Sequence, residues 1–229
     1  MLRHPVNVRD LGGLPLEGGG STRPGVLLRG DAPYAGDVAP PGVVWPPRVV
    51  VDLRDSQERD RSPYAWPEGT VVHSRELHDR ANIARISKGA KLLSVYDAMI
   101  EVAGPAIASM VELVGHGPAF VHCTAGKDRT GFATIALLLL AGVEESAVIE
   151  DYRRTEAAME GVMARLDLPP EILELFDPEW ALAPEEAARL MIDHVTGWAG
   201  GVRGWFLDHG ATDAGIDRFR AAIRVEVTP

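Results

Sequence analysis

One stretch near the middle of the chain constrains its fold and its chemistry more than any other. Residues 121–131 read VHCTAGKDRTG, with a short apolar run at 118–121 before the loop and a longer one at 132–143 behind it. This pattern predicts a strand, a glycine-containing loop and a helix. Such a loop directs backbone N–H groups and the positive end of the helix dipole at one point in front of it, which favours the binding of an anion.

Two side chains of this loop have complementary chemistry. Cys123 is the only cysteine of the chain, and Arg129 follows it after five intervening residues. A helix N-terminus and a nearby guanidinium both favour thiolate over thiol. The planar fork of an arginine can hold two phosphoryl oxygens at once, and Gly126 lets the backbone approach a ligand without a Cβ in the way. The loop therefore predicts a nucleophile at the bottom of a phosphate-shaped cup.

A family resemblance supports this interpretation over a cysteine that only packs in the core. Residues 122–130 resemble the signature loop of cysteine-dependent protein phosphatases, and the AGKDR form is similar to the bacterial tyrosine/serine protein phosphatase family. The resemblance extends over essentially the whole chain and implies a protein-tyrosine-phosphatase-like α/β fold. Its other segments are residues 7–13 (NVRDLGG), 23–25, 28–30, 51–54 (VDLR), 149–152 (IEDY) and 204–220.

Composition limits the class of protein. A length of 229 residues predicts one domain over 1–229, and a hydrophobic content of 46% with 24% charged residues is typical of globular proteins. The formal charge of −10 argues against general affinity for nucleic acid or anionic membranes. The single cysteine excludes an internal disulfide framework, and the N-terminus lacks the apolar segment of a signal peptide. We expect a cytoplasmic protein without stable membrane insertion, although some relatives act outside their cell without an obvious signal.

Hydrophobic patterns predict strands that alternate with helices. The expected strands are 26–28, 48–53, 70–73 and 118–121. The expected helices are 91–116, with a break or kink at Gly104-Pro105, then 132–143, 144–166, 184–198, 204–209 and 212–224. Asp55 and Glu58 are spaced as a capping box that opens a short helix. The alternation predicts a mostly parallel central sheet flanked by helices, with ligands bound at the carboxyl ends of its strands.

The expected reaction is hydrolysis of a phosphomonoester through a phosphocysteine. Cys123 would attack phosphorus, and Arg129 would hold the phosphoryl oxygens. The backbone amides that share this task belong to Thr124, Ala125, Gly126, Lys127, Asp128 and Arg129. The predicted substrate is a phosphorylated protein, with phosphotyrosine first and phosphoserine or phosphothreonine next, and a phosphoinositide is the alternative.

Two carboxyl groups compete for the role of general acid. The chain has no Trp-Pro-Asp motif, since its nearest matches are WPE at 66–68 and WPP at 45–47. Asp128 lies where the resembled family has a loop aspartate, and its alternative role is a salt bridge that shapes the loop. Asp52 ends a predicted strand, and its alternative role is a hydrogen bond to Arg129 or to a loop amide.

Four further residues carry weaker predictions. His122 should point away from Cys123 and brace the loop. Thr130 is expected to donate a hydrogen bond to the thiolate, or else to cap the helix. Lys127 is expected as a second cation at the rim, or else as a solvated surface lysine. Tyr96 is expected to contact substrate, or else to pack in the core.

Other functional classes are disfavoured by particular features. Residues 155–198 form either a helical lid over the site or a packed helical layer. The seven histidines form no ligand-spaced cluster, so no metal or cofactor is expected. Residues 204–224 resemble a helix-turn-helix, but Asp208, Asp213 and Asp217 interrupt its positive face. A rhodanese-like sulfurtransferase would not need Asp128, and the oligomeric state stays open.

Overall fold

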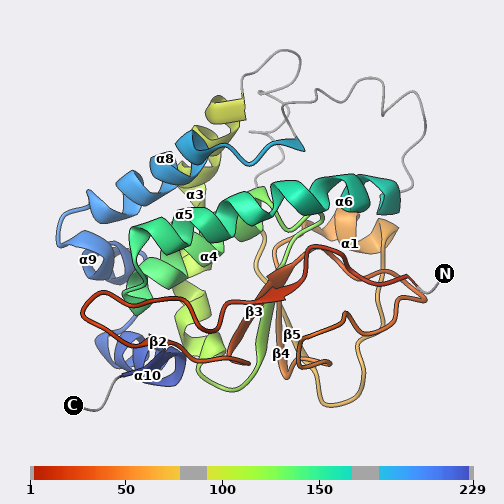
Figure 1. Cartoon of the computed structure of the whole chain (residues 1–229), viewed down its shortest axis with the longest axis horizontal. Coiled ribbons are helices and arrows are strands. Elements are labelled where there is room, and N and C mark those ends of the chain that lie inside the picture. The colour runs from red at the N-terminus through yellow and green to blue at the C-terminus, as the bar shows by residue number, and fades with distance from the viewer. Residues whose placement is uncertain (1–2, 78–91, 167–180, 227–229) are drawn as a thin grey trace.

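The computed structural model describes residues 3–77, 92–166 and 181–226. Its strands are β1 (Arg9–Asp10), β2 (Ser21–Thr22), β3 (Leu27–Gly30), β4 (Val49–Asp52), β5 (Val71–Ser74), β6 (Ala119–His122) and β7 (Arg224–Val225). Its α-helices are α1 (Ser56–Arg61), α3 (Leu92–Val114), α4 (Asp128–Ala141), α5 (Glu145–Arg154), α6 (Met159–Arg165), α8 (Glu185–Thr196), α9 (Gly201–Asp208) and α10 (Asp213–Ile223). A short 3₁₀ helix, η1 (Glu156–Ala158), joins α5 to α6, and the three lie end to end in Figure 1.

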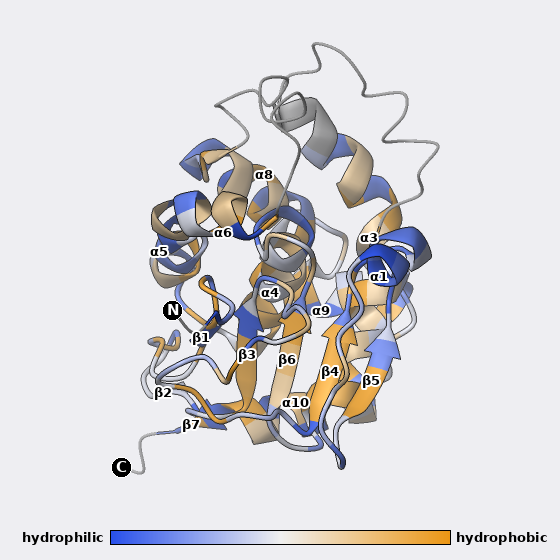
Figure 2. Cartoon of the chain, turned by 90° about the vertical axis from the view of Figure 1, so that its right-hand side faces the viewer, coloured by the Kyte–Doolittle hydropathy of each residue, from blue (hydrophilic) through white to orange (hydrophobic). Residues whose placement is uncertain are grey.

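The central sheet has five strands in the order β1-β3-β6-β4-β5. The strands β3, β6, β4 and β5 run parallel, and β1 joins the edge antiparallel. The inner strands are short, mainly apolar and fully buried, as expected for parallel strands covered on both faces. Figure 2 shows these strands side by side, largely in hydrophobic colours. The predicted α/β architecture with a mostly parallel sheet is confirmed.

The register of the parallel strands places their carboxyl ends at one level. Gly30 of β3 and Asp52 of β4 both pair with His122 of β6, and Ser74 of β5 pairs with Asp52. The chain therefore leaves β6 for α4 and β4 for α1 at the same edge of the sheet, which Figure 2 shows beneath α1, α4 and α6. Residues far apart in sequence meet there.

The two faces of the sheet are covered differently. The main core lies between the sheet and a helical layer in which α3 and α4 pack against strands, while α8 and α10 pack against those helices. On the opposite face, Leu28, Val50 and Phe120 pack against side chains from loop segments. These loop side chains are Val8, Val43, Trp45 and Trp66.

The predicted break at Gly104-Pro105 does not end the helix. The helix α3 runs through Pro105 to Val114, and Ala103 and Ile107 on either side are buried in the core. A Cβ on Gly104 would lie 2.0 Å from the His209 ring. The glycine is therefore explained by close packing with a histidine that follows α9, and core contacts on both sides of the proline outweigh its local cost.

The remaining helical predictions hold with adjusted bounds. The region 144–166 is divided into α5, η1 and α6, and α4 ends at Ala141, with Gly142 as a left-handed cap at a φ of 83°. The capping box at the start of α1 is present, with Asp55 and Glu58 each bonded to the other's backbone. Within the described segments, no helix combines the length and apolarity that crossing a membrane requires.

Candidate active site

The loop between β6 and α4 holds Cys123 at its base. We call residues 123–129 the phosphate loop. The thiol is buried, with 2% of the residue exposed, and the backbone N–H of Gly126 donates to its Sγ at 3.2 Å. The loop therefore directs a backbone hydrogen-bond donor at the sulfur of Cys123.

Gly126 is required by two features of its position. Its φ is +70°, in the left-handed region that side chains disfavour. A Cβ there would lie 2.3 Å from the carbonyl carbon of Gly30 and 2.4 Å from its oxygen. The phosphate loop thus packs directly on the end of β3, and any larger residue would push it away.

Side chains on the outside of the phosphate loop hold its carbonyl groups. The Asn7 amide donates to the carbonyls of Ala125 at 3.0 Å and Gly126 at 3.3 Å. Arg29 donates to the Gly126 carbonyl at 2.9 Å and is paired with buried Asp151 at 2.7 Å. The Ala125 carbonyl shares its planar peptide unit with the Gly126 N–H, so the bond from Asn7 to that carbonyl helps to keep the N–H directed at sulfur.

These contacts around the outside of the phosphate loop give a structural role to segments to which the sequence analysis assigned none. Arg9 contacts Asp151 at 2.6 Å and the Asn7 side chain at 2.7 Å. Asp151 thus joins Arg9 and Arg29, and the Asp151 pKa is lowered because these two cations outweigh the effect of its burial. The segments 7–13, 28–30 and 149–152 converge on the phosphate loop, although only their resemblance marked them in the sequence.

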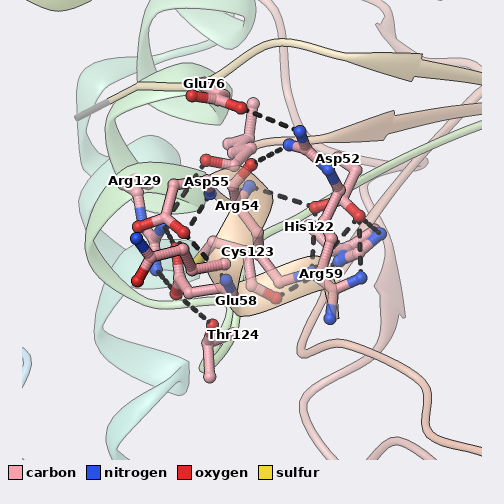
Figure 3. A network of polar contacts seen from close by, with 12 residues as sticks. Asp52, Arg54, Asp55, Glu58, Arg59, Glu76, His122, Cys123, Thr124 and Arg129 are labelled. Atoms are coloured by element: carbon pink, nitrogen blue, oxygen red, sulfur yellow. Dashed lines mark hydrogen bonds and ion pairs between the residues drawn. The ribbon is translucent and has the colours of Figure 1, made fainter. Parts of the chain in front are cut away.

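Arg129 is held by a carboxylate that sequence reasoning missed. Its Nη1 and Nη2 donate to Glu58 at 2.6 and 2.7 Å, and the Thr124 hydroxyl donates to the same carboxylate at 2.6 Å. Burial alone would raise the pKa of Glu58, but the hydrogen bonds and charge of Arg129 lower it to about 2. Figure 3 shows this group beside Cys123. The only signal in the sequence was the capping spacing from Asp55.

Asp128 lies at the entrance of α4, where three polar groups gather around it. The Tyr96 hydroxyl donates to Asp128 Oδ1, and the Tyr152 hydroxyl lies 2.7 Å from that of Tyr96. Lys127 Nζ lies 3.2 Å from the same carboxyl oxygen. Burial and the nearby Asp128 charge raise the pKa of both tyrosines, so both hydroxyls keep their protons. The Asp128 side chain remains 29% exposed.

The structure corrects the predicted surroundings of Lys127 and refines those of Tyr96 and Thr130. Lys127 is only 1% exposed and donates to the Leu182 carbonyl at 3.0 Å, so it is neither a rim cation nor a solvated lysine. Tyr96 is fully buried in the core with its hydroxyl turned to Asp128. Thr130 lies inside α4, whose N-cap residue is Lys127, so the capping alternative is wrong. Within the described residues, the Thr130 hydroxyl has no hydrogen-bond partner.

Asp52 forms a buried ion pair with the neighbouring Arg54. Arg54 donates to it from Nη2 at 2.8 Å and from Nε at 3.0 Å, and both residues are buried. Burial would raise the Asp52 pKa, but the hydrogen bonds and positive charge of Arg54 lower it. Among the described residues, Arg129 donates to Glu58 and the Leu53 carbonyl, so the expected bond between Asp52 and Arg129 is absent.

His122 braces the loop from the far side of β6. Its Nδ1 donates to the Cys123 carbonyl at 3.2 Å, and its ring stacks on Phe120 with centroids 5.0 Å apart. Its Nε2 lies 3.8 Å from Asp52. Burial lowers the His122 pKa and outweighs the Asp52 charge, so the ring is disposed to stay neutral. Figure 3 shows Asp52 and His122 on the side of Cys123 opposite Arg129.

The site thus combines a thiol, an arginine fork, a backbone amide directed at the sulfur and the partly exposed carboxyl group of Asp128. Across the described ranges, no three His, Cys, Asp or Glu side chains gather as metal ligands. A buried cysteine between a parallel strand and a helix, with an arginine from the first turn of that helix, defines a phosphatase of the cysteine-dependent class. The chain belongs to the tyrosine phosphatase family, whose model matches residues 1–225.

Curated relatives carry the same assignment. The triple specificity protein phosphatase PtpB of Mycobacterium tuberculosis is 30% identical over 226 aligned residues, which cover 76% of this chain and 81% of the relative. A tyrosine-protein phosphatase of Nostoc commune is 29% identical over 50% of this chain and 42% of the relative. The chain is therefore an enzyme that hydrolyses phosphomonoesters, and the predicted family is confirmed.

A solved structure shows a weaker likeness. The core catalytic domain of the PP-IP phosphatase SIW14 from S. cerevisiae, in complex with citrate, aligns with a TM-score of 0.41 and 14% identity. The alignment covers 68% of this chain and 78% of the other. At this TM-score the likeness carries no argument about fold or substrate.

Proposed function

We propose that Cys123 is the nucleophile of a metal-independent phosphatase that acts first on protein phosphotyrosine. The observation that carries this proposal is the 3.2 Å hydrogen bond from the Gly126 N–H to Cys123 Sγ, in a loop that Asn7 and Arg29 hold from outside. A preorganised donor at a thiolate stabilises it without reorganisation during the reaction. Arg129 supplies the fork for the phosphoryl oxygens.

The reaction proceeds in two displacements at phosphorus. In the first, the Cys123 thiolate forms an S–P bond while the P–O bond to the tyrosine breaks, and Asp128 gives its proton to the departing oxygen. In the second, Asp128 takes a proton from water, whose oxygen bonds to phosphorus as the S–P bond breaks and the thiolate returns. Division into two steps lowers each barrier, and the acid contributes roughly 10²–10⁴-fold.

Asp128 is our choice of general acid over Asp52. The Asp52 carboxylate is buried in an ion pair with Arg54, which favours its ionised form. The Asp128 side chain is partly exposed, and Tyr96 contacts only its Oδ1. The second oxygen can therefore carry a proton to a leaving group. Asp128→Asn should lower kcat on a phosphotyrosine peptide by 10²-fold or more, with little loss on an activated aryl phosphate. Equal losses on both substrates would favour a loop-shaping role.

Other residues of the phosphate loop support substrate binding in different ways. The amides of Thr124, Ala125, Gly126 and Lys127 are proposed to hold the phosphoryl oxygens, and Thr130 to donate its unpaired hydroxyl to the thiolate. The Tyr96 hydroxyl is proposed to position Asp128, and Tyr96 is not proposed to contact the substrate directly. Asp52 contributes indirectly, by holding Arg54 beside the loop.

The broader substrate range belongs to this proposal as well. The relative PtpB is named for triple specificity, which supports phosphoserine or phosphothreonine and phosphoinositides as further substrates. We assign the chain to one catalytic domain in the cytoplasm, where its single cysteine stays reduced. For residues 155–198 we favour a packed helical layer over a lid. Residues 167–180 of this segment lie outside the described residues.

DNA binding through α9 and α10 is not supported by the charges there. Arg203 pairs with Asp213 and Asp217, and Arg218 pairs with Glu112, so these arginines are neutralised by neighbours. A helix that contacts phosphates needs unpaired cations. Retention on DNA at low salt would reopen this alternative.

The proposal is tested by hydrolysis of a phosphotyrosine peptide in the presence of EDTA. We expect wild-type activity to persist and Cys123→Ser to abolish it. A matched control is Ser109→Ala, which changes a hydroxyl on α3 that contacts Arg75 instead of the site. Activity of Cys123→Ser near the wild-type level would overturn the mechanism, and loss of wild-type activity in EDTA would point to a metal.

A further inference from the structure

A pocket of about 660 Å³ adjoins the phosphate loop on the side of α1. Four arginines line it, and we call it the arginine pocket: Arg3, Arg54, Arg61 and Arg165. This volume lies within the range of small-ligand sites. Its concentration of guanidinium groups stands out in a chain whose net charge is −10.

The arginine pocket opens onto the catalytic site itself. Thr124, the residue after the nucleophile, and Glu58, the partner of Arg129, both line it. Arg61 follows Glu58 by three residues on α1, so their Cβ atoms are about 5–6 Å apart. A group bound in the pocket would lie beside a phosphoryl group in the cup.

Two of the four arginines already have carboxylate partners. Arg54 is paired with Asp52 at 2.8 Å. Arg165 contacts Asp31 at 3.0 Å and Asp37 at 2.8 Å, and its side chain is 8% exposed. The charges of these two arginines are therefore already compensated by carboxylates.

The other two arginines are the source of uncompensated charge. Arg3 and Arg61 are exposed, and neither makes an ion pair with any carboxylate in the described residues. Arg3 lies in the irregular N-terminal segment before β1, and Arg61 lies at the end of α1. The first is fixed because the Arg3 carbonyl accepts from the Val38 N–H at 2.8 Å and the His4 carbonyl accepts from Arg165. Two cations from different segments of the chain thus line one cavity.

We infer that the arginine pocket binds a second phosphate of the substrate, carried on a peptide residue near the phosphotyrosine. This inference rests on the proposed function. Two guanidinium groups provide charge-assisted hydrogen bonds for a dianion. The wall also includes Tyr34, Pro63 and Leu166, which suit the hydrocarbon of a peptide better than a bare polyol. The structure therefore assigns a preference for doubly phosphorylated protein segments.

The test compares phosphotyrosine peptides with and without a second anion. The second group is a non-hydrolysable phosphonate placed one, two or three residues away on either side, and alanine replaces it in the reference peptide. For wild type, we expect kcat/KM to rise about tenfold at one or more positions, as for a charge-assisted hydrogen bond. In R3Q/R61Q this ratio should fall to within about twofold of one.

The matched control is Arg153→Gln, on α5 and away from the arginine pocket. Arg153 is 60% exposed and lies 3.7 Å from Glu185, so its replacement removes one positive charge away from the arginine pocket. It should keep the tenfold ratio. A wild-type ratio near one at every position, or an unchanged ratio in R3Q/R61Q, would overturn the inference. So would a dependence on Arg3 and Arg61 seen with inositol polyphosphates but not with peptides. Hydrolysis of the reference peptide reports separately on the proposed function, because it requires only the cup.

Discussion

At the scale of single residues, Glu58 connects the fold of one element to the chemistry of another. Its side chain accepts the Asp55 N–H as part of the α1 capping box, and it also holds both terminal nitrogens of Arg129. A residue that caps a helix can therefore also fix the orientation of a phosphate-binding fork. Arginine held in this way loses less rotamer freedom when a phosphate arrives.

The lowered pKa of Glu58 predicts a pH-dependent contribution to stability. Its pKa falls from 4.5 to about 2 in the folded chain, so its stabilising effect is present above pH 4.5 and is lost as pH falls toward 2. We expect the difference in unfolding free energy between wild type and Glu58→Gln to be constant from pH 5 to 8 and to shrink below that. Urea unfolding across this range measures it.

Glu76→Gln is the control for this prediction, since Glu76 forms an exposed pair with Arg59. That pair should contribute little at any pH. A difference for Glu58→Gln that stayed constant down to pH 2.5 would show that its charge does not stabilise the fold.

Tyr96 is predicted to position Asp128 for proton transfer. Removal of its hydroxyl in Tyr96→Phe leaves Asp128 Oδ1 without that donor, so the carboxyl group should sample more orientations. We expect kcat on a phosphotyrosine peptide to fall about tenfold, with a smaller loss on an activated aryl phosphate whose leaving group needs no proton. Steady-state kinetics on both substrates checks this.

Tyr152→Phe provides the comparison, because Tyr152 reaches Asp128 only through Tyr96. Its effect should be smaller and should show the same substrate dependence. If Tyr96→Phe slowed both substrates equally, Tyr96 would act on the shape of the phosphate loop instead.

At the scale of elements, the phosphate loop depends on its contact with the end of β3. Gly126→Ala would place a Cβ 2.3 Å from the Gly30 carbonyl carbon and at an unfavourable φ. The loop would have to move, and the Gly126 N–H would leave Cys123 Sγ. We expect a loss of 1–3 kcal/mol in unfolding free energy and a fall of at least 10²-fold in kcat, the scale of losing one preorganised donor.

Gly18→Ala is the control that separates the effect of an unfavourable φ from the effect of a steric contact. Gly18 has a similar φ of +81°, but a Cβ there would meet nothing within 4 Å. Its cost should be near 1 kcal/mol, with activity retained. Activity in Gly126→Ala comparable to that of Gly18→Ala would show that close packing on β3 is not required.

Local pattern predicted the elements themselves well. The strands β4 and β6, the loop between β6 and α4, and the capping box of α1 follow from apolar runs and spacing. At Gly104-Pro105 the pattern predicted a break or a kink, and the helix continues without a break, while a tertiary contact with His209 explains the glycine. The pattern failed at Lys127, whose burial against the Leu182 carbonyl depends on a distant segment.

The pairings within the site could not be predicted from the sequence either, because they also join residues that are distant in the chain. Arg129 could be recognised from its spacing to Cys123, but its partner Glu58 lies 71 residues away. The sheet brings the two together only through the order and register of β4 and β6. Such pairs can be recognised once the order of the strands is known, because the fold brings the ends of different strands to one edge of the sheet.

At the scale of the whole molecule, an acidic chain places several buried arginines around the phosphate loop. Arg9, Arg29 and Arg129 are buried or nearly so, and each is paired with a carboxylate. Removal of one partner from a buried pair typically costs 3–5 kcal/mol. Asp151, which joins two of these arginines, therefore supports both the fold and the phosphate loop.

The most direct test of the account is detection of the phosphoenzyme. Wild-type chain mixed with excess phosphotyrosine peptide, quenched in acid within milliseconds and examined by intact and peptide mass spectrometry, should carry one phosphoryl group on Cys123. The Cys123→Ser variant should carry none at any time. A phosphoryl group on another residue, or full turnover without Cys123, would contradict the assignment of the thiol as nucleophile.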